Sequence, residues 1–404
     1  MKKSIILGAC LLTGMLANAQ MSVVKDVERK LKESKPNYAE ALKAIQPALT
    51  NPETSNQYLP WYLAGKAAFG IYDEAYKKEM ISGQLSNDEK KAAGHAAIDA
   101  HGYYEKAIAL PDEKGKTPNK KAKEMIKSLA ESYNDMYRAG FYMIQAGDNE
   151  GAYDAWEVYC NLPSSTVLGD KAPKSAPDSI IGQTKFYQSL AAFYAKQHDK
   201  SVKKANDAIA LNYYDIDLFR VGLQASQELA DTAAMIKFAE IGSEKFGNQE
   251  IAFIGTLINI NVARADYSAC HTLIGNALAG VPADSVKFRS QLLNVEGIVY
   301  DQEGNDPKAI ECFDQAIALD PNFARAYLMK GNTIYEAAVK ADEASQDVTL
   351  SPVIKEEYLK ATKLFEKAYE LAPDEMTQLP RVLYTLYYRL GKGYEADAEK
   401  WQNM

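Results

Sequence analysis

The side chains best suited to chemistry are few in this sequence and lie far apart. The four histidines are His95, His101, His198 and His271. His95 and His101 are six residues apart, which places them on different faces of a helix, and the other two fall in separate segments. Because this is not the spacing of metal ligands, we interpret all four as surface or turn histidines and expect neither a metal nor a cofactor.

The candidate nucleophiles do not form a recognisable constellation either. Beyond the N-terminal segment the cysteines are Cys160, Cys270 and Cys312, at wide spacing and without a Cys-x-x-Cys motif. This pattern indicates no zinc site or disulfide framework, although one bridge stays possible. The sequence also lacks Gly-x-Ser-x-Gly, His-Glu-x-x-His and a phosphate-binding glycine loop. It therefore predicts no catalytic residues and a non-enzymatic protein, although an active site assembled from separate segments would leave no local motif.

Composition and charge narrow the class of partner. The 404 residues are 47% hydrophobic and 25% charged, the mixture of a soluble globular protein, and the formal net charge is -8. Phosphate contacts need a concentrated basic face, whereas the lysines here are scattered through an acidic chain. We expect a protein or peptide partner and no nucleic acid. The oligomeric state cannot be derived from these numbers.

The N-terminal segment resembles an export signal. Two lysines precede an apolar stretch, and Ala17-Asn18-Ala19 before Gln20 is the small-x-small pattern of a signal-peptidase site. We therefore expect residues 1–19 to be a signal peptide cleaved after Ala19, and the mature chain to be periplasmic or secreted without an integral membrane segment. The alternative is an outer-membrane lipoprotein acylated at Cys10, within Leu7-Gly8-Ala9-Cys10.

The rest of the chain is organised by a repeating pattern of small and large apolar residues. Its clearest copy fills the recurring positions of a 34-residue unit with Leu293, Gly297, Tyr300, Gly304, Ala309, Phe313, Ala316 and Pro321. Glycine and alanine suit places where two antiparallel helices approach closely, and proline ends the second helix. This segment strongly resembles a tetratricopeptide repeat.

The same register recurs along the chain. Gly140, Ala152 and Trp156 fall at matching positions of a unit that begins at Tyr133, and Gly222 and Phe238 do so in a unit that begins at Asp215. Weaker copies begin near Gly182 and Ile251. The resemblance implies an all-α fold, a right-handed α-solenoid of about nine helix pairs, in a secreted or periplasmic bacterial member of the family.

Interruptions of the pattern suggest how the array is divided. The Pro/Ser-rich segment 161–179 reads as a connection between an N-terminal helical segment, 20–160, and a C-terminal array, 180–404. Two repeats carry insertions, one after Gly65 and one near 336–358. Both read as extended helix ends joined by a polar connection, and they are either decoration or projections beside a groove.

Members of this family hold peptides or partner subunits in the concave groove lined by the first helix of each pair. The resemblance therefore implies an interaction scaffold of the bacterial cell envelope that binds a peptide or partner protein. A glycan-uptake component of the outer membrane and a passive structural spacer are the alternatives. The chaperone-binding clamp of some members is not supported, because Leu328 stands where it needs lysine. The expected groove residues are Tyr137, Phe141, Phe219, Leu223, Asn294, Ile298, Arg325, Leu328, Asn332 and Tyr335.

Overall fold

The computed structural model describes residues 21–247, 249–345 and 349–404, and within these ranges the regular elements are helices, with no strand. The proposed signal peptide 1–19 and Cys10 lie outside the described residues. After a helical stretch at 21–30, the α-helices up to residue 231 are α2 (Tyr38–Thr50), α3 (Tyr58–Ser82), α4 (Asn87–Ala109), α5 (Ala122–Glu131), α6 (Tyr133–Gln145), α7 (Asn149–Asn161), α8 (Asp178–Tyr194), α9 (His198–Ala210) and α10 (Ile216–Glu228).

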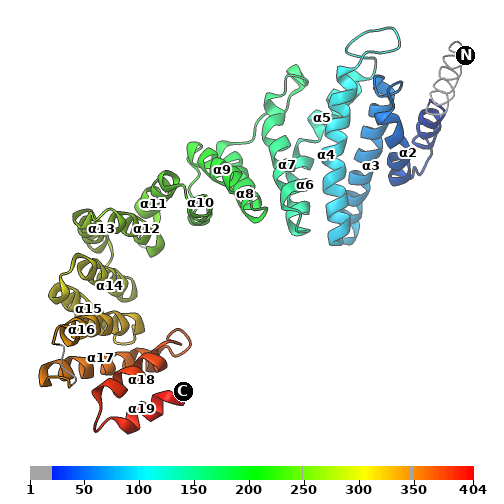
Figure 1. Cartoon of the computed structure of the whole chain (residues 1–404). Coiled ribbons are helices and arrows are strands. Elements are labelled where there is room, and N and C mark those ends of the chain that lie inside the picture. Colours follow the sequence, from blue (N-terminus) through cyan, green and yellow to red (C-terminus); the bar gives the residue numbers. More distant parts are fainter. Residues whose placement is uncertain (1–20, 248, 346–348) are drawn as a thin grey trace, which may run out of the picture. The chain divides into compact units, whose positions relative to one another are not determined.

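The remaining helices follow one another with short connections (Figure 1). They are α11 (Thr232–Phe246), α12 (Ile251–Ala263), α13 (Tyr267–Gly280), α14 (Val286–Glu303), α15 (Asp306–Leu319), α16 (Ala324–Ser345), α17 (Pro352–Leu371), α18 (Leu379–Leu390) and α19 (Glu395–Gln402). The chain is thus an all-α solenoid built from successive helices.

The chain divides into two compact units, of which the first ends at Asp231 and the second begins at Thr232. The Pro/Ser-rich segment 161–179 lies inside the first unit instead of separating the two. In this segment Leu168 is buried, and the backbone N–H of Ala176 donates to the hydroxyl of Tyr133 over 3.1 Å. Helices α7 and α8 contact each other across it. Composition suggested a break here, but these contacts hold the segment against the helices.

Within each unit, helices pack against their neighbours in sequence, and some also contact the helix two places along. In the first unit α8 contacts both α9 and α10, and in the second unit α14 contacts α12, α13, α15 and α16. The first helices of successive pairs therefore touch, α8 with α10 in the first unit and α12, α14 and α16 in the second. This is how stacked helix pairs bury a continuous apolar core.

The helices of a pair approach most closely at a glycine opposite an aromatic ring. A Cβ atom added to Gly297 on α14 would lie 2.5 Å from the ring of Phe313 on α15. A Cβ atom on Gly140 of α6 would likewise overlap Trp156 of α7, whose side chain is buried. No side chain larger than hydrogen fits such a contact without movement of the ring, so the glycines are required for close packing.

Both insertions extend helices. The first lengthens the α3–α4 hairpin, and α4 begins with a capping box in which Ser86 and Glu89 bond each other's backbone N–H groups. The second lengthens α16, where Asp342 accepts hydrogen bonds from Tyr358 of α17 and from Arg389 of α18. This second insertion therefore ties three helices together, which gives it a structural role.

No helix in the described ranges is both long enough and apolar enough to cross a membrane.

Candidate functional site

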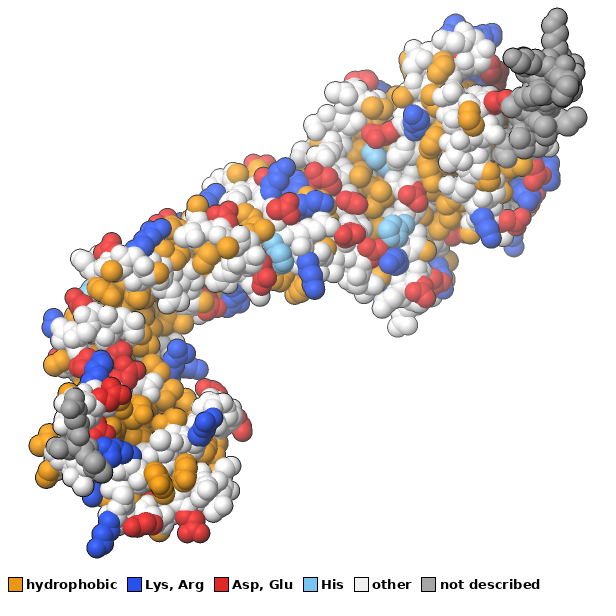
Figure 2. All heavy atoms as spheres, in the orientation of Figure 1, with side chains coloured by type: hydrophobic (Ala, Val, Ile, Leu, Met, Phe, Trp, Pro, Cys, Tyr) orange, Lys and Arg blue, Asp and Glu red, His pale blue; other side chains and the backbone are white. Residues whose placement is uncertain are grey.

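The second unit contains a cavity of about 840 Å³. Its walls come from α12, α14, the residues that lead into α16, and the turn after α17. The space-filling view shows hydrophobic side chains gathered in a hollow of this part of the chain, with charged side chains around it (Figure 2). The cavity is therefore formed by secondary-structure elements that are far apart in the sequence.

The lining of the cavity follows the groove register of the repeats. On α14, Gln291, Asn294 and Ile298 occupy positions 2, 5 and 9 of the unit that begins at Ser290. On α12, positions 2, 5, 9 and 12 of the unit that begins at Ile251 are Ala252, Gly255, Asn259 and Val262, and all four line the same cavity. One face of each of these two first helices therefore points into a common space.

The side chains around the cavity are apolar or uncharged amides, with few exceptions. The larger apolar residues of the lining are Ile251, Ile258, Val262, Val295, Ile298, Val299, Phe323 and Leu371. The amide residues are Asn259, Gln291, Asn294, Gln302 and Asn322. Its charged side chains are Arg325 and Glu375, of opposite sign and both exposed. Such a surface favours an uncharged ligand over an ion.

Asn294 is the most unusual of these residues. It is only 2% exposed, and its Oδ1 atom is buried without a hydrogen-bond partner among the described residues. Buried amide oxygens in folded proteins nearly always accept a hydrogen bond, because leaving one unpaired costs about 1–3 kcal/mol. The unpaired acceptor therefore marks the wall of the cavity as a place where a donor is missing.

The structure places the expected groove residues of the second unit in two groups. Asn294, Ile298 and Arg325 line the cavity. Leu328 and Tyr335 pack instead against the apolar core of α16–α19, where the Tyr335 ring lies 6.0 Å from that of Tyr358, and Asn332 is half-buried outside the cavity lining.

Phe219 and Leu223 are not the exposed groove residues that the sequence suggested. They are 0% and 5% exposed, respectively, and the Phe219 ring stacks on that of Tyr214 at 6.2 Å. A large apolar side chain at these positions gains more from packing between helices than from facing water. Both are corrected to core residues.

Part of the repeat pattern matches a known protein family. A family model described as TPR repeat matches residues 297–337, which cover the C-terminal part of α14, all of α15 and the first part of α16. This match falls on the helices whose glycine-to-ring contact and alternate-helix packing are described above. This segment of the chain is thus similar to a tetratricopeptide repeat.

Solved structures of tetratricopeptide-repeat proteins resemble the chain only distantly. The C-terminal part of a TPR repeat-containing protein from Cytophaga hutchinsonii is 11% identical, with a TM-score of 0.42 over 66% of this chain and 93% of that one. A TPR repeats protein from Bacteroides fragilis is 15% identical, with a TM-score of 0.31 over 61% of this chain and 95% of that one. No curated protein matches the chain.

In the helix pair α6–α7 of the first unit, aromatic rings occupy the expected groove positions. Tyr137 and Phe141 hold their ring centroids 5.0 Å apart, and the Phe141 ring lies 5.4 Å from Trp156 and 5.3 Å from Tyr187 of α8. Burial raises the pKa of Tyr137. The two rings of α6 therefore contact each other, and Phe141 also contacts α8, so much of their surface is used within the unit.

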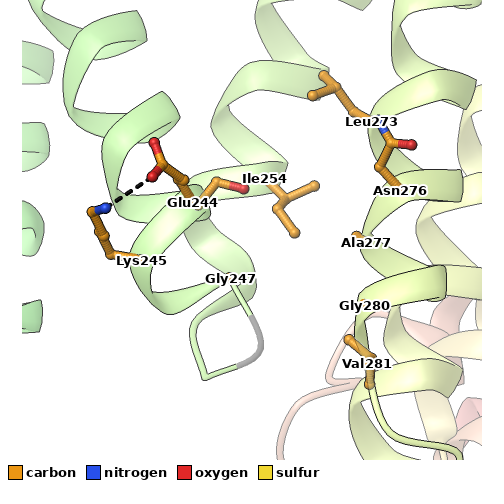
Figure 3. Close-up of a pocket in the computed structure, with 10 residues that line it drawn as sticks. Glu244, Lys245, Gly247, Ile254, Leu273, Asn276, Ala277, Gly280 and Val281 are labelled. Atoms are coloured by element: carbon orange, nitrogen blue, oxygen red, sulfur yellow. Dashed lines mark hydrogen bonds and ion pairs between the residues drawn. The ribbon is translucent and has the colours of Figure 1, made fainter.

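A smaller pocket of about 410 Å³ lies between the end of α11, α12 and α13 (Figure 3). Small residues, Ala277 and Gly280 of α13, leave this space open, and Glu244 and Lys245 at its edge pair with each other over 2.8 Å. None of its buried lining atoms is an unpaired polar group among the described residues. It presents a less specific surface than the cavity on α12 and α14.

The groups with possible chemistry make contacts of a structural kind. His95 pairs with Asp148, which caps α7, over 2.6 Å, and His271 pairs with Glu296 over 2.9 Å. The three cysteines are free, and burial raises the pKa of Cys312 to about 11, so it stays a neutral thiol at ordinary pH. In the described part of the chain, no three His, Cys, Asp or Glu residues could together hold a metal ion.

The sequence contained part of the signal for this cavity. Applying the groove register to the weak repeat at Ile251 would have found Ala252, Gly255, Asn259 and Val262. The turn after α17, which includes Glu375, lies outside the groove register, and its contribution depends on how the helices stack.

Proposed function

We propose that the chain is a non-enzymatic interaction scaffold of the bacterial cell envelope, which binds a peptide or a segment of a partner protein in the cavity of its second unit. Tetratricopeptide repeats are protein-interaction modules. One observation supports binding in this cavity. The groove positions of two successive first helices, α12 and α14, converge on one open cavity that contains an unpaired buried acceptor. An apolar surface with a few convergent polar groups is typical of a binding site.

The partner-binding part of this proposal is tested by placing charge on the rim of the cavity. Asn259 and Gln302 are exposed and line the cavity, so Asn259→Arg together with Gln302→Arg should leave the helices intact and block the site. We expect this variant to retrieve much less partner from an envelope extract than the wild-type chain, with an unchanged circular dichroism spectrum.

The matched control places the same charges on second helices. Asn276 of α13 and Gln315 of α15 are exposed and lie outside the cavity lining, so Asn276→Arg together with Gln315→Arg should retrieve the partner normally. If the control variant loses the partner and the cavity variant keeps it, the partner binds at the second helices, where Asn276 also lines the smaller pocket. If neither variant changes retrieval, a passive spacer becomes the better account.

Location in the envelope is proposed from the sequence of residues 1–19. Cleavage after Ala19 should give a mature chain that begins at Gln20. Mass analysis of the N-terminus, on protein purified from the producing cells, tests this. A diacylated chain that begins at Cys10 would instead establish a lipoprotein and favour the glycan-uptake alternative.

A further inference from the structure

One polar atom in the wall of the second unit's cavity, Oδ1 of Asn294, lacks a hydrogen-bond donor among the described residues. This oxygen is buried, although its side chain lines the cavity. Rotation about χ2 of an asparagine is broad and roughly two-fold, so the amide can turn its oxygen toward the cavity without any change in the backbone. A ligand that donates a hydrogen bond there would remove the penalty of the unpaired acceptor.

The surroundings of Asn294 indicate what kind of donor fits. The adjacent polar side chains, Gln291 and Asn259, are amides, which offer both a donor and an acceptor, as a peptide group requires. Ile298 and Val295 add apolar surface to the same lining. The opposite charges of Arg325 and Glu375 give the lining no net charge, so a strongly charged ligand gains nothing.

The backbone conformation of the ligand also follows. In a helix, the N–H groups beyond the first turn are already bonded within the helix, so a helical ligand offers no free donor along its length. An extended segment keeps its N–H groups free. Amide side chains around apolar walls therefore favour an extended chain, because they can form hydrogen bonds with its free backbone groups.

We propose that the cavity binds an extended, uncharged peptide segment with apolar side chains, and that one backbone N–H of this segment donates to Oδ1 of Asn294. This inference rests on the proposed function and deepens it. It makes recognition depend on one backbone hydrogen bond and on apolar contact, with little contribution from charge.

The test uses peptides of known sequence as probes. Random peptides displayed on phage are selected against the full chain, and the selected peptides are synthesised and their affinities measured by fluorescence anisotropy. We expect uncharged, apolar sequences whose affinity changes little between low and high salt, because no ion pair is formed. Selection of acidic or basic peptides with strong salt dependence would overturn the inference.

The hydrogen bond itself is tested by a double cycle. Asn294→Leu should weaken the selected peptides about tenfold. Methylation of a single backbone nitrogen of the peptide should weaken wild-type binding by a similar factor and have little further effect in the variant, since both changes remove the same bond. The matched control is Asn276→Leu, at an exposed asparagine outside the cavity lining, which should bind the peptides normally.

The outcomes separate this inference from the proposed function. If peptides bind, and Asn259→Arg with Gln302→Arg blocks them while Asn294→Leu does not, the cavity binds peptides but the inference is wrong. If no peptide is selected, or if the chain instead associates with itself through the cavity, the inference is also wrong. The melting temperature of Asn294→Leu should be unchanged or raised. Were it lowered, the methylated peptides would still test the bond on the wild-type chain.

Discussion

The repeat of α6 and α7 in the first unit and the repeat of α14 and α15 in the second share their packing but differ in their grooves. Both place a glycine of the first helix against a ring of the second, Gly140 against Trp156 and Gly297 against Phe313. At the two groove positions that follow the same register, the first repeat has aromatic residues, whereas the second has an amide, Asn294, and an aliphatic residue.

This difference has a structural consequence. The rings of Tyr137 and Phe141 contact each other and their neighbours, so their surface is used within the first unit. Asn294 and Ile298 leave a cavity beside them. The positions between paired helices thus maintain the fold, while the groove positions can be filled by large side chains or left open. A binding site can therefore arise in one repeat without loss of the solenoid.

The largest effect should come from removing the ring that both repeats require. Trp156→Ala and Phe313→Ala should each lower the free energy of unfolding by about 3–5 kcal/mol, because each leaves a cavity in a close-packed core. Hydrogen exchange measured by mass spectrometry should show the loss of protection mainly in α6 and α7 for the first variant, and in α14 and α15 for the second. Equal loss throughout the chain in both variants would contradict a division into two units.

Adding one methyl group opposite the ring should have the next largest effect. Gly297→Ala should destabilise by about 1–3 kcal/mol, because the new Cβ overlaps Phe313. In the variant Phe313→Leu, the same change should cost less, since the smaller side chain leaves room. Gly275→Ala on α13 is the control: nothing lies within 4 Å of its added Cβ, so it should stabilise by about 0.5–1 kcal/mol. Urea unfolding of Gly297→Ala, Phe313→Leu, the double variant and Gly275→Ala gives the free energies of unfolding to compare.

Lowering the pH should reduce the stability of the first unit, because the carboxyl group of Glu157 becomes protonated. Burial alone would raise the pKa of this carboxyl, but the ion pair with Lys204 and a hydrogen bond from Gln188 hold it at about 2, below its usual 4.5. Because the folded pKa is the lower one, the contribution is complete above pH 4.5 and is lost as the pH falls toward 2. Allowing for partial exposure of the side chain, we expect a loss of about 1–2 kcal/mol.

The control for this effect is Glu157→Gln, which cannot titrate. Its stability should lack this part of the pH dependence, as measured by thermal unfolding between pH 4.5 and pH 2. An identical acid dependence in the variant and the wild-type chain would show that the ion pair with Lys204 does not produce the effect.

The smallest effects should differ in sign at the two equivalent groove positions. Tyr137→Leu should destabilise by about 1 kcal/mol, because the ring contacts are lost. Asn294→Leu should stabilise the free chain by about 1 kcal/mol, because it removes a buried acceptor that has no partner. Urea unfolding of both variants tests this contrast. A marked destabilisation by Asn294→Leu would show that the amide already has a structural partner.

Much of the fold could be predicted from local residue types. Glycine opposite a ring, proline after the second helix and polar turns are short-range signals, so the all-α solenoid of paired helices is confirmed. The short helix α5 was not expected, because it lies outside the repeat register. The division between Asp231 and Thr232 falls inside a predicted repeat, where composition gives no warning.

The candidate site was less predictable, because exposure depends on neighbours that are distant in the sequence. The register correctly indicated which face of α14 to examine, but it could not distinguish Phe219, which is buried, from Ile298, which lines the cavity. It also could not include the turn at Glu375, which follows α17 and lines the cavity together with residues of α12 and α14. Binding at any of these residues stays a prediction.

A photo-crosslinking experiment with the full chain and the partner it retrieves tests most directly whether the partner binds at the cavity of the second unit. A benzophenone side chain is placed at Gln302 on the cavity, at Asn134 on the first helix of the α6–α7 repeat, or at Gln315 on a second helix, all of which are exposed. We predict a covalent adduct with the partner from the Gln302 position and little from the other two. Adducts mainly from Asn134 or Gln315 would contradict the assignment of binding to the cavity of the second unit.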